Sequence, residues 1–422
     1  MTRLQAWIDQ LDQTDQDAIL KAEFKVVTPM FLGGGTQDAE SIRPPAIKGA
    51  LRFWWRALNW SRCLQQTGCE TQALQKLHDQ EAILFGLAAK KDSNGVQTGG
   101  QGVFNLKVIQ EVQMMKPDWS PSGGVQYLLG QGLWNYKTKL LRSALANGSN
   151  FNVEIHWNLG RLKTAASLLE MDISNIKHSL DDALLAFGLL GGLGSRARKG
   201  LGSVSITGLS GSQWSVPECR QSYTHVIQQL LKPSLSATVL PPFTALSAKS
   251  RLDISIEGTN AMELLEKIGV EMQMYRSWGM KGQVGDKTAE KNFPDDHDQA
   301  LLVSQGTQPT KAPDRAVFGM PHNYFFSSTK GKVDVHVKKD AAGERRSSPL
   351  FIHPHLLPNG HIIAVQLLLP AVFYPGSNPM LEYKSKRIFT LPVADANWQV
   401  ITRYMNRFKN KVTVFSPNEQ GV

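Results

Sequence analysis

Three cations and a tryptophan recur at helical spacing near the start of the chain: Lys48, Arg52, Trp55 and Arg56. No carboxylate occurs in residues 41–69, whereas exposed helix faces ordinarily mix both signs of charge. Such cations can bind phosphates while an indole ring stacks on a base or ribose, which is the chemistry of single-stranded nucleic-acid binding. In the alternative interpretation, the ring covers the edge of the core and the arginines pair with distant carboxylates.

A second candidate for phosphate contacts is the glycine-rich segment 191–203. It holds five glycines and three cations, Arg196, Arg198 and Lys199. The segment lacks the GxxxxGK[ST] spacing of a nucleotide-hydrolysing loop, and it lies between an expected helix and an expected strand, the reverse of the dinucleotide-binding order. We expect a flexible backbone that approaches a polyanion closely, with the cations contacting phosphates. Alternatively, it is a plain connection whose cations face water.

Metal and cofactor chemistry have little support in the sequence. His353 and His355 alternate on an expected strand, and an acidic run begins at Asp295, but neither set is completed by further ligands. The three cysteines, Cys63, Cys69 and Cys219, are odd in number and form no CxxC spacing. We therefore expect no metal, no cofactor and no disulfide, and interpret the cysteines as small buried hydrophobic residues.

A strand and a helix must position the first group of cations. Residues 24–30 read as a strand, three glycines at 33–35 end it, and Pro44-Pro45 begins a helix over residues 45–60. At 100° per residue, two adjoining apolar stripes cover about half of that helix. The first stripe is Ile47, Leu51, Trp54 and Leu58, and the second is Ala46, Ala50, Phe53, Ala57 and Trp60, which leaves Lys48, Arg52, Trp55, Arg56 and Asn59 on the opposite face.

The remaining patterns predict the same order of elements twice. In the first half, a helix over 71–85, strands over 102–110 and 151–157, a helix over 179–190 and a strand over 202–207 follow the first strand and helix, giving β-α-β-β-α-β. The second half repeats the order, with strands over 249–256, 350–356, 362–369 and 412–415 and helices over 260–278 and 396–408. The predicted fold is α+β: two ferredoxin-like (RRM-like, βαββαβ) domains in tandem with inserted loops.

We expect three parts along the chain: an N-terminal helical extension over 1–20, a first ferredoxin-like domain over 21–210 and a second over 211–422. The extension is expected because apolar residues recur at helical spacing over 4–21. The boundary is expected within 208–242, and the inserted loops 281–313 and 327–348 look mobile. In this plan the loop after the first strand can lie near the loop before the last strand. Lys48 and Arg52 would then share one groove with Arg196 and Arg198.

Length and charge agree with this interpretation. At 422 residues the chain exceeds the size at which one core keeps growing, so two domains are expected. The formal charge of +10 favours a polyanionic partner. No stretch reaches the ~20 apolar residues that a membrane span needs, and the N-terminus is too polar and acidic for a signal peptide. We expect a cytoplasmic protein with no membrane partner.

Three segments carry a resemblance to a known family. They are TPMFLGGG followed by IRPPAIKGALRFWWRAL (28–35 and 42–58), the glycine segment GGLGSRARKGLGSV (191–204) and RRSSPLFI (345–352). Together they resemble the first RAMP subunit of the type III-B CRISPR effector, the Cmr complex, and the glycine segment is typical of RAMP proteins generally. The resemblance covers the first half well and the second half mainly through its RRSSPL segment.

The resemblance implies a non-catalytic RNA-binding subunit with no cofactor, built from two ferredoxin-like domains. Its partners would be the 3′ region of the CRISPR RNA, complementary single-stranded target RNA and other RAMP subunits. The implied RNA-binding residues are Lys48, Arg52, Trp54, Trp55 and Arg56 in the first helix and Gly191, Gly192, Gly194, Arg196, Arg198 and Lys199 in the glycine segment. Which tryptophan stacks on RNA stays open, because the helical projection turns Trp54 toward the core.

Three alternatives belong to other classes. A RAMP-type endoribonuclease acting on CRISPR RNA or target RNA would most often employ a histidine near the first helix, yet residues 1–77 contain none, and His78 is the nearest. A target-cleaving subunit would need a metal-binding aspartate, for which only Asp38 qualifies. A purely structural cap would contact proteins and not RNA.

Overall fold

The computed structural model describes residues 19–35, 38–91, 97–115, 119–212, 214–279, 281–338, 345–374, 376–394 and 396–417. Most of the expected N-terminal helix over 4–21 lies outside these residues. Its last part is not helical, because residues 19–21 belong to the first strand.

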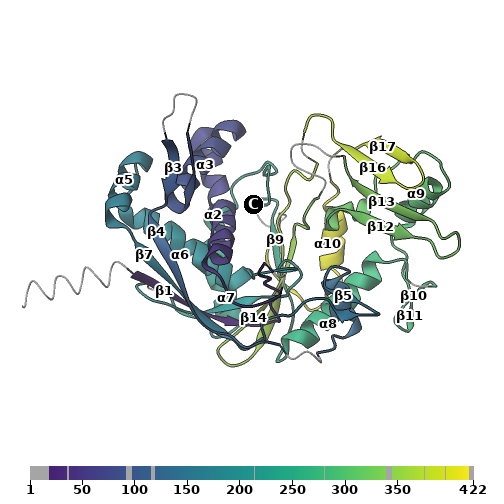
Figure 1. The fold of residues 1–422 in the computed structure, drawn as a ribbon, viewed down its shortest axis with the longest axis horizontal. Helices are drawn as coiled ribbons and strands as arrows, with labels where there is room; N and C mark the ends of the chain where they lie inside the picture. Colours follow the sequence, from purple (N-terminus) through teal and green to yellow (C-terminus); the bar gives the residue numbers. More distant parts are fainter. Residues whose placement is uncertain are drawn as a thin grey trace, which may run out of the picture.

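The chain is a mixed α/β protein with antiparallel sheets (Figure 1). The first half contains a four-stranded sheet in the order β4-β7-β1-β8, and every neighbouring pair is antiparallel. Buried and less buried residues alternate along β1, as expected when one sheet face packs on a core. The strands are β1 (Ile19–Val26), β4 (Phe104–Glu111), β7 (Asn150–Trp157) and β8 (Val204–Leu209).

The helices of the first half pack on this sheet. α2 (Pro44–Thr67) is longer than predicted, because Cys63 continues its buried face and Gly68 ends it in the left-handed conformation with φ 66°. α3 (Glu70–Phe85) ends at Gly86 as predicted, and α6 (Ile173–Leu190) begins earlier than expected.

Several short elements of the first half are absent from the prediction. β2 (Gly86–Lys91) and β3 (Gln97–Gln101) form a hairpin, α5 (Leu159–Leu169) precedes α6, and β5 (Trp134–Asn135) pairs with β6 (Lys139–Leu140). α4 (Gly123–Leu129) packs on a helix of the second half, where the Glu266 carboxylate accepts from the Val125 backbone N–H at 2.9 Å.

The second half contains a sheet with the same strand order. Its strands run β14-β15-β9-β18, which corresponds to the order of the first sheet when strands are numbered along each half. The elements lie within a few residues of their predicted positions. They are β9 (Arg251–Gly258), α8 (Ala261–Arg276), β14 (Leu350–Leu356), β15 (Ile362–Leu368), α10 (Gln399–Met405) and β18 (Val412–Phe415).

A third sheet was not predicted. It has the order β12-β13-β16-β17 and has its own small core around Val333, Val335 and Leu381. The described parts of the two expected inserted loops contribute helices and strands to this region, and their mobility stays a prediction. The elements here are β10 (Gln283–Val284), β11 (Lys287–Thr288), α9 (Pro294–Ser304), η2 (Asp314–Phe318), β12 (His322–Phe325), β13 (Lys332–Val337), β16 (Met380–Lys384) and β17 (Ile388–Pro392).

Each of the two large hydrophobic clusters among the described residues contains side chains of both halves. The second sheet lies between α2 and α6 on one side and α8 and α10 on the other (Figure 1). Val365 and Leu367 pack into the core of the first half, whereas Leu350 and Ile352 pack with α8. Burial on both faces explains why β15, IIAVQLL, reads as an almost continuous apolar run.

The segment expected to hold the domain boundary is also structured. Within 208–242 it forms α7 (Arg220–Leu231) and η1 (Lys232–Ser234), and the hydroxyl of Tyr223 donates to the Leu189 carbonyl at 2.6 Å.

Of the cysteines, Cys63 is buried as expected, but Cys69 and Cys219 are exposed; all three are free. Among the described residues, no helix combines the length and apolar character needed to cross a membrane.

Candidate nucleic-acid interface

The glycine-rich segment joins the two halves of the molecule. The Ile352 backbone N–H, at the start of β14, donates to the Arg198 carbonyl at 3.1 Å, and the Arg198 guanidinium donates to the Ser348 carbonyl at 2.7 Å. On the other side, the Thr28 hydroxyl donates to the Gly200 carbonyl at 2.7 Å. The segment is therefore held firmly at the interface and carries its cations there.

The glycines of this segment serve the protein's own packing. A Cβ on Gly191 would lie 2.6 Å from the Phe187 carbonyl oxygen, and one on Gly192 would lie 2.6 Å from the Gly202 carbonyl oxygen. Gly194 has φ +85°, and a Cβ there would lie 2.5 Å from the Phe31 carbonyl oxygen. The expectation of a flexible backbone that approaches a polyanion was wrong for Gly191 and Gly192, because they pack against protein backbone; Gly194 does line a cavity.

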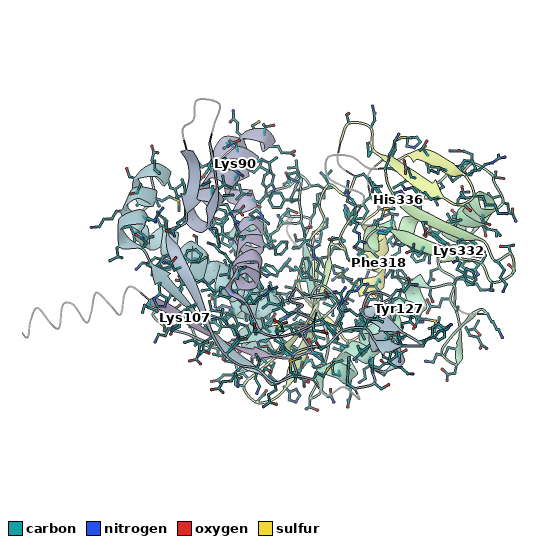
Figure 2. The ribbon with its side chains drawn as sticks, viewed as in Figure 1. Lys90, Lys107, Tyr127, Phe318, Lys332 and His336 are labelled. Carbon is teal, nitrogen blue, oxygen red and sulfur yellow. The ribbon has the colours of Figure 1, made fainter. Side chains whose placement is uncertain are left out.

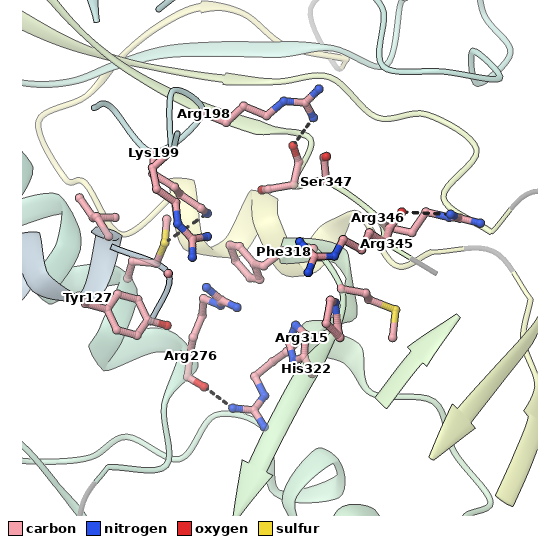
Figure 3. Close-up of a pocket in the computed structure, with 18 of the residues that line it drawn as sticks. Tyr127, Arg198, Lys199, Arg276, Arg315, Phe318, His322, Arg345, Arg346 and Ser347 are labelled. Atoms are coloured by element: carbon pink, nitrogen blue, oxygen red, sulfur yellow. Dashed lines mark hydrogen bonds between the residues drawn. The ribbon is translucent and has the colours of Figure 1, made fainter. Parts of the chain in front are cut away.

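That cavity has a volume of about 900 Å³ and lies between the two halves (Figure 3). The described residues that line it include seven cations and one histidine but no carboxylate. Three cations come from the glycine segment and the others from the second half. They are Arg196, Arg198, Lys199, Arg276, Arg315, Arg345 and Arg346, with His322.

Carbonyl oxygens and aromatic rings hold the guanidinium groups in place. The guanidinium carbon of Arg276 lies 4.6 Å from the Phe318 ring centre and 6.0 Å from that of Tyr127, and Figure 2 shows these two rings near each other beside α10. Arg315 donates to the Arg276 carbonyl at 2.6 Å, and Arg346 donates to the Phe373 carbonyl at 3.0 Å. These contacts fix the direction of the three guanidinium groups.

One carboxylate stands behind the cavity wall. Asp296 is buried and accepts from the Arg315 side chain at 3.1 Å and from the backbone N–H groups of Asp314 and Arg315. It orients Arg315 but does not line the cavity. The net charge of the wall therefore stays strongly positive.

Lys199 is the most unusual of these cations. Its side chain faces the cavity with protein packed around the rest, and its Nζ lies 3.8 Å from the sulfur of Met272. Burial holds the pKa of Lys199 well below its usual range, and the positive charges of Arg276, Arg196 and Arg198 lower it further. A bound anion would relieve this repulsion and favour the protonated amine.

Three other groups of the cavity, His322, Arg198 and Arg196, show the same electrostatic pattern. Burial and the nearby Arg276 and Arg315 hold the pKa of His322 well below its usual value, so this histidine is neutral near pH 7. Burial lowers the pKa of Arg198 to about 10. Burial and Arg345 also lower the pKa of Arg196. Cations held together against their own repulsion indicate a site for a polyanion.

The first helix does not present the face that its sequence predicts. Trp55 is 1% exposed, packs edge-on against Phe85 at 6.1 Å and donates its indole N–H to the Ser179 hydroxyl at 3.2 Å. Its predicted exposed position was wrong, because α3 and α6 cover that side of α2 as well. Trp54 is 2% exposed, so both tryptophans lie in the core.

The arginines of this helix follow the alternative interpretation. Arg56 donates to the Glu81 carboxylate at 2.7 Å, and the Nε of Arg52 lies 2.9 Å from the same carboxylate in α3. Lys48 is half-buried, with its amine 5.4 Å from the Phe104 ring centre, and burial together with Arg52 lowers its pKa. The cavity is lined by Arg196 and Arg198 but not by Lys48 or Arg52. The prediction that all four share one groove was therefore wrong.

The sequence prediction missed the cations of the second half. Arg345 and Arg346 lie in the RRSSPL segment that contributed to the resemblance, but no local pattern marked them as part of the site. Arg276 is the last residue of α8, and Arg315 lies in η2. The residues around them in the sequence form no pattern that distinguishes these two arginines from ordinary surface arginines. Only the packing of the halves brings them to the glycine segment.

The possible metal ligands have other partners. His353 and His355 are buried in the shared core, where the Nδ1 of His355 lies 3.2 Å from the Ser205 hydroxyl. The carboxylate of Asp38 accepts from the Ser143 hydroxyl at 3.1 Å. Within the described residues, no group of three or more histidine, cysteine or acidic side chains is arranged to hold a metal ion.

The sequence and the fold can now be compared with known proteins. Residues 23–205 match the sequence model of the RAMP superfamily. Over the whole chain, the fold is similar to that of Cmr1 from Pyrococcus furiosus in its apo crystal structure, with a TM-score of 0.51 and 17% sequence identity, covering 94% of this chain and 99% of that chain.

A further structural match is a chain of the cryo-EM structure of the type III-B Cmr-beta bound to cognate target RNA. It has a TM-score of 0.47 and 12% identity, and it covers 92% of this chain and 98% of that chain. A search of curated protein sequences found no match.

Proposed function

We propose that this protein is a non-catalytic RNA-binding subunit of a type III-B CRISPR effector. In this role it holds the 3′ region of the CRISPR RNA and helps engage complementary target RNA, with other RAMP subunits as neighbours in the cytoplasm. The observation that carries the proposal is the cavity with seven cations and no carboxylate on its described wall. The match of residues 23–205 to the RAMP superfamily and the similarity of the fold to Cmr1 support the class of protein.

The same proposal extends to the domain organisation. Each half contains a four-stranded antiparallel sheet in which strands numbered along the half stand in the order 2-3-1-4. This order, with a helix after the first and third strands, supports two tandem ferredoxin-like domains, 21–210 and 211–422. The RNA cavity lies where they meet, so both domains contribute phosphate contacts.

The glycine segment and the second-half cations replace the first helix as the main phosphate-binding surface. The phosphates of a single strand would lie along Arg196, Lys199 and Arg276. In the first helix, Lys48 and Arg52 would then support the fold, because they face Phe104 and Glu81. Substituting Arg52 by glutamate would test stability more than RNA binding, since the new carboxylate would face Glu81.

The proposal is tested by the salt dependence of RNA binding. For single strands, the log-log slope of affinity against salt is roughly −0.7 for each phosphate neutralised. We expect a slope steeper than about −2 for the wild-type protein. The variant Arg196→Gln with Arg276→Gln loses two of these contacts, so its slope should become shallower by about 1.4.

A matched control keeps the same change in net charge. Arg161→Gln with Arg387→Gln removes two cations that do not line the cavity, and its slope should equal that of the wild type. Equal slopes for both double variants would contradict the proposed site. An equal-length DNA duplex as competitor tests the preference for single-stranded RNA.

The endoribonuclease alternative predicts a different result. His78 is exposed and its Nδ1 lies 3.3 Å from the Asp79 carboxylate. If the protein cleaves RNA through this histidine, end-labelled RNA should give product bands on a denaturing gel that disappear in His78→Ala. We expect intact RNA with both proteins.

A further inference from the structure

A second cavity, of about 440 Å³, lies beside the cationic one, between α2, α3 and residues 243–244. The two cavities share Arg198 in their walls. The smaller one is mainly apolar and aromatic, and we call it the aromatic pocket. It is lined by Phe53, Arg56, Leu74, Leu77, His78, Glu81, Arg198, Phe243 and Thr244.

Arg198 is a fixed partition between the two cavities. Its guanidinium carbon lies 5.5 Å from the Phe53 ring centre and 4.6 Å from the Phe351 ring centre. Its hydrogen bond to the Ser348 carbonyl prevents the side chain from swinging away. A chain of nucleotides with phosphates in the cationic cavity therefore passes Arg198 at the edge of the aromatic pocket.

The aromatic rings of this pocket are held rigidly and keep part of their surface exposed. Phe53 packs against Trp54 at 5.2 Å and Phe351 at 5.6 Å between ring centres. Phe243 packs against Trp60 at 5.5 Å. Rigid, partly exposed rings are suitable surfaces for stacking a base, because little side-chain entropy is lost on binding.

The carboxylate of Glu81 supplies a hydrogen-bond acceptor in the wall of the aromatic pocket. Its Oε1 is paired with Arg56 and Arg52, which hold the group in the wall. A carboxylate held in this way can accept a hydrogen bond from the amino group of a base. The wall thus has the chemistry of a base site next to a phosphate site.

We propose that the aromatic pocket seats one amino-bearing nucleobase of the same RNA strand whose phosphates occupy the cationic cavity. This inference rests on the proposed function. It assigns base preference to the aromatic pocket, between α2, α3 and residues 243–244, and charge recognition to the cationic cavity. Adenine, cytosine and guanine carry the required amino group, and uracil does not.

The test uses an oligouridine that contains a single 2-aminopurine, a fluorescent base whose emission falls on stacking. Binding to the wild-type protein should quench the emission through stacking. Oligocytidine should compete about tenfold better than oligouridine of equal length, because only cytosine has the amino group that Glu81 can accept from. Phe243→Leu should lose both effects while its salt slope stays unchanged. Phe325→Leu is the matched control, because Phe325 is 60% exposed and belongs to the third sheet.

The outcomes separate this inference from the proposed function. Steep salt dependence with no quenching and equal competition by the two oligomers would overturn the aromatic pocket alone. Failure of the wild-type protein to bind RNA would overturn the proposed function and the pocket with it. The wild-type competition experiment keeps the inference testable if Phe243→Leu does not fold.

Discussion

At the scale of single residues, the site is defined by cations that gather on a cavity wall with no carboxylate among its described residues. Arg276 is backed by the Phe318 ring and Lys199 by the sulfur of Met272. The Arg52 and Arg56 side chains, by contrast, face the Glu81 carboxylate. Equal residue types thus have opposite roles: one group is neutralised within the protein, and the other keeps its charge for a ligand.

The lowered pKa of Lys199 leads to a prediction about pH. The folded state releases the Lys199 proton at a lower pH than the unfolded state, whose lysine has the ordinary pKa of 10.5. Between those two values the unfolded state binds more protons, so the free energy of unfolding should rise with pH. At lower pH, where both states are protonated, the full cost of the buried charge remains.

Lys199→Met should remove the free-energy cost of the buried charge, so the free energy of unfolding should rise less steeply with pH. Urea unfolding of the wild type and the variant at a series of pH values measures it, and the difference between the two proteins isolates Lys199 from the tyrosines that titrate nearby. The variant should be more stable than the wild type at neutral pH and should bind RNA more weakly. Parallel pH curves would contradict the assignment.

At the scale of elements, the glycine segment is a rigid connector that positions cations. Gly194 and Gly202 have φ values of +85° and +64°, and a Cβ on either would meet the backbone within 2.5 Å. The segment also pairs with β14 through Ile352. Its glycines are therefore needed for close packing, and its cations reach the cavity because the packing holds them there.

Gly194→Ala should lower the free energy of unfolding by roughly 1–3 kcal/mol, because the new Cβ is strained at this φ and meets the Phe31 carbonyl. The control is Gly123→Ala at the start of α4, where a Cβ would meet nothing within 4 Å. Denaturant unfolding compares the two. Similar losses in both variants would show that backbone strain in the segment is unimportant.

At the scale of the whole molecule, the second sheet belongs to the core of both halves. Val365 is completely buried among residues of the first half, although β15 lies in the second. The third sheet has a separate small core, which contains Val335. We expect the two halves to unfold together and the third sheet to open more independently.

Hydrogen exchange with mass spectrometry tests this coupling. Val365→Ala should lower the opening free energy of peptides from α2 and from α8 alike, by about 2 kcal/mol. Val335→Ala is equally buried and conservative, but it should lower protection mainly in β12, β13 and β16. Loss of protection in α8 without loss in α2 would show that the halves unfold separately.

The sequence by itself determined the order of the main helices and strands, and it located the cations of the glycine segment. Alternation and helical spacing are local properties, so β14 and β18 were located to the residue and α3 to within one residue at its start. The glycine segment was also found from its composition. Family resemblance added the class of protein, which the match of residues 23–205 supports.

Only the tertiary structure decided which side chains form the site. Trp55 was expected on the surface because a helical projection gives spacing but not the number of neighbours around the helix, and α3 and α6 cover it. Arg276 and Arg315 are far in sequence from Lys199 and reach it because the second sheet packs into the first half. Whether a cation faces a carboxylate or a cavity depends on such long-range packing, so the local sequence pattern around the cation does not predict it.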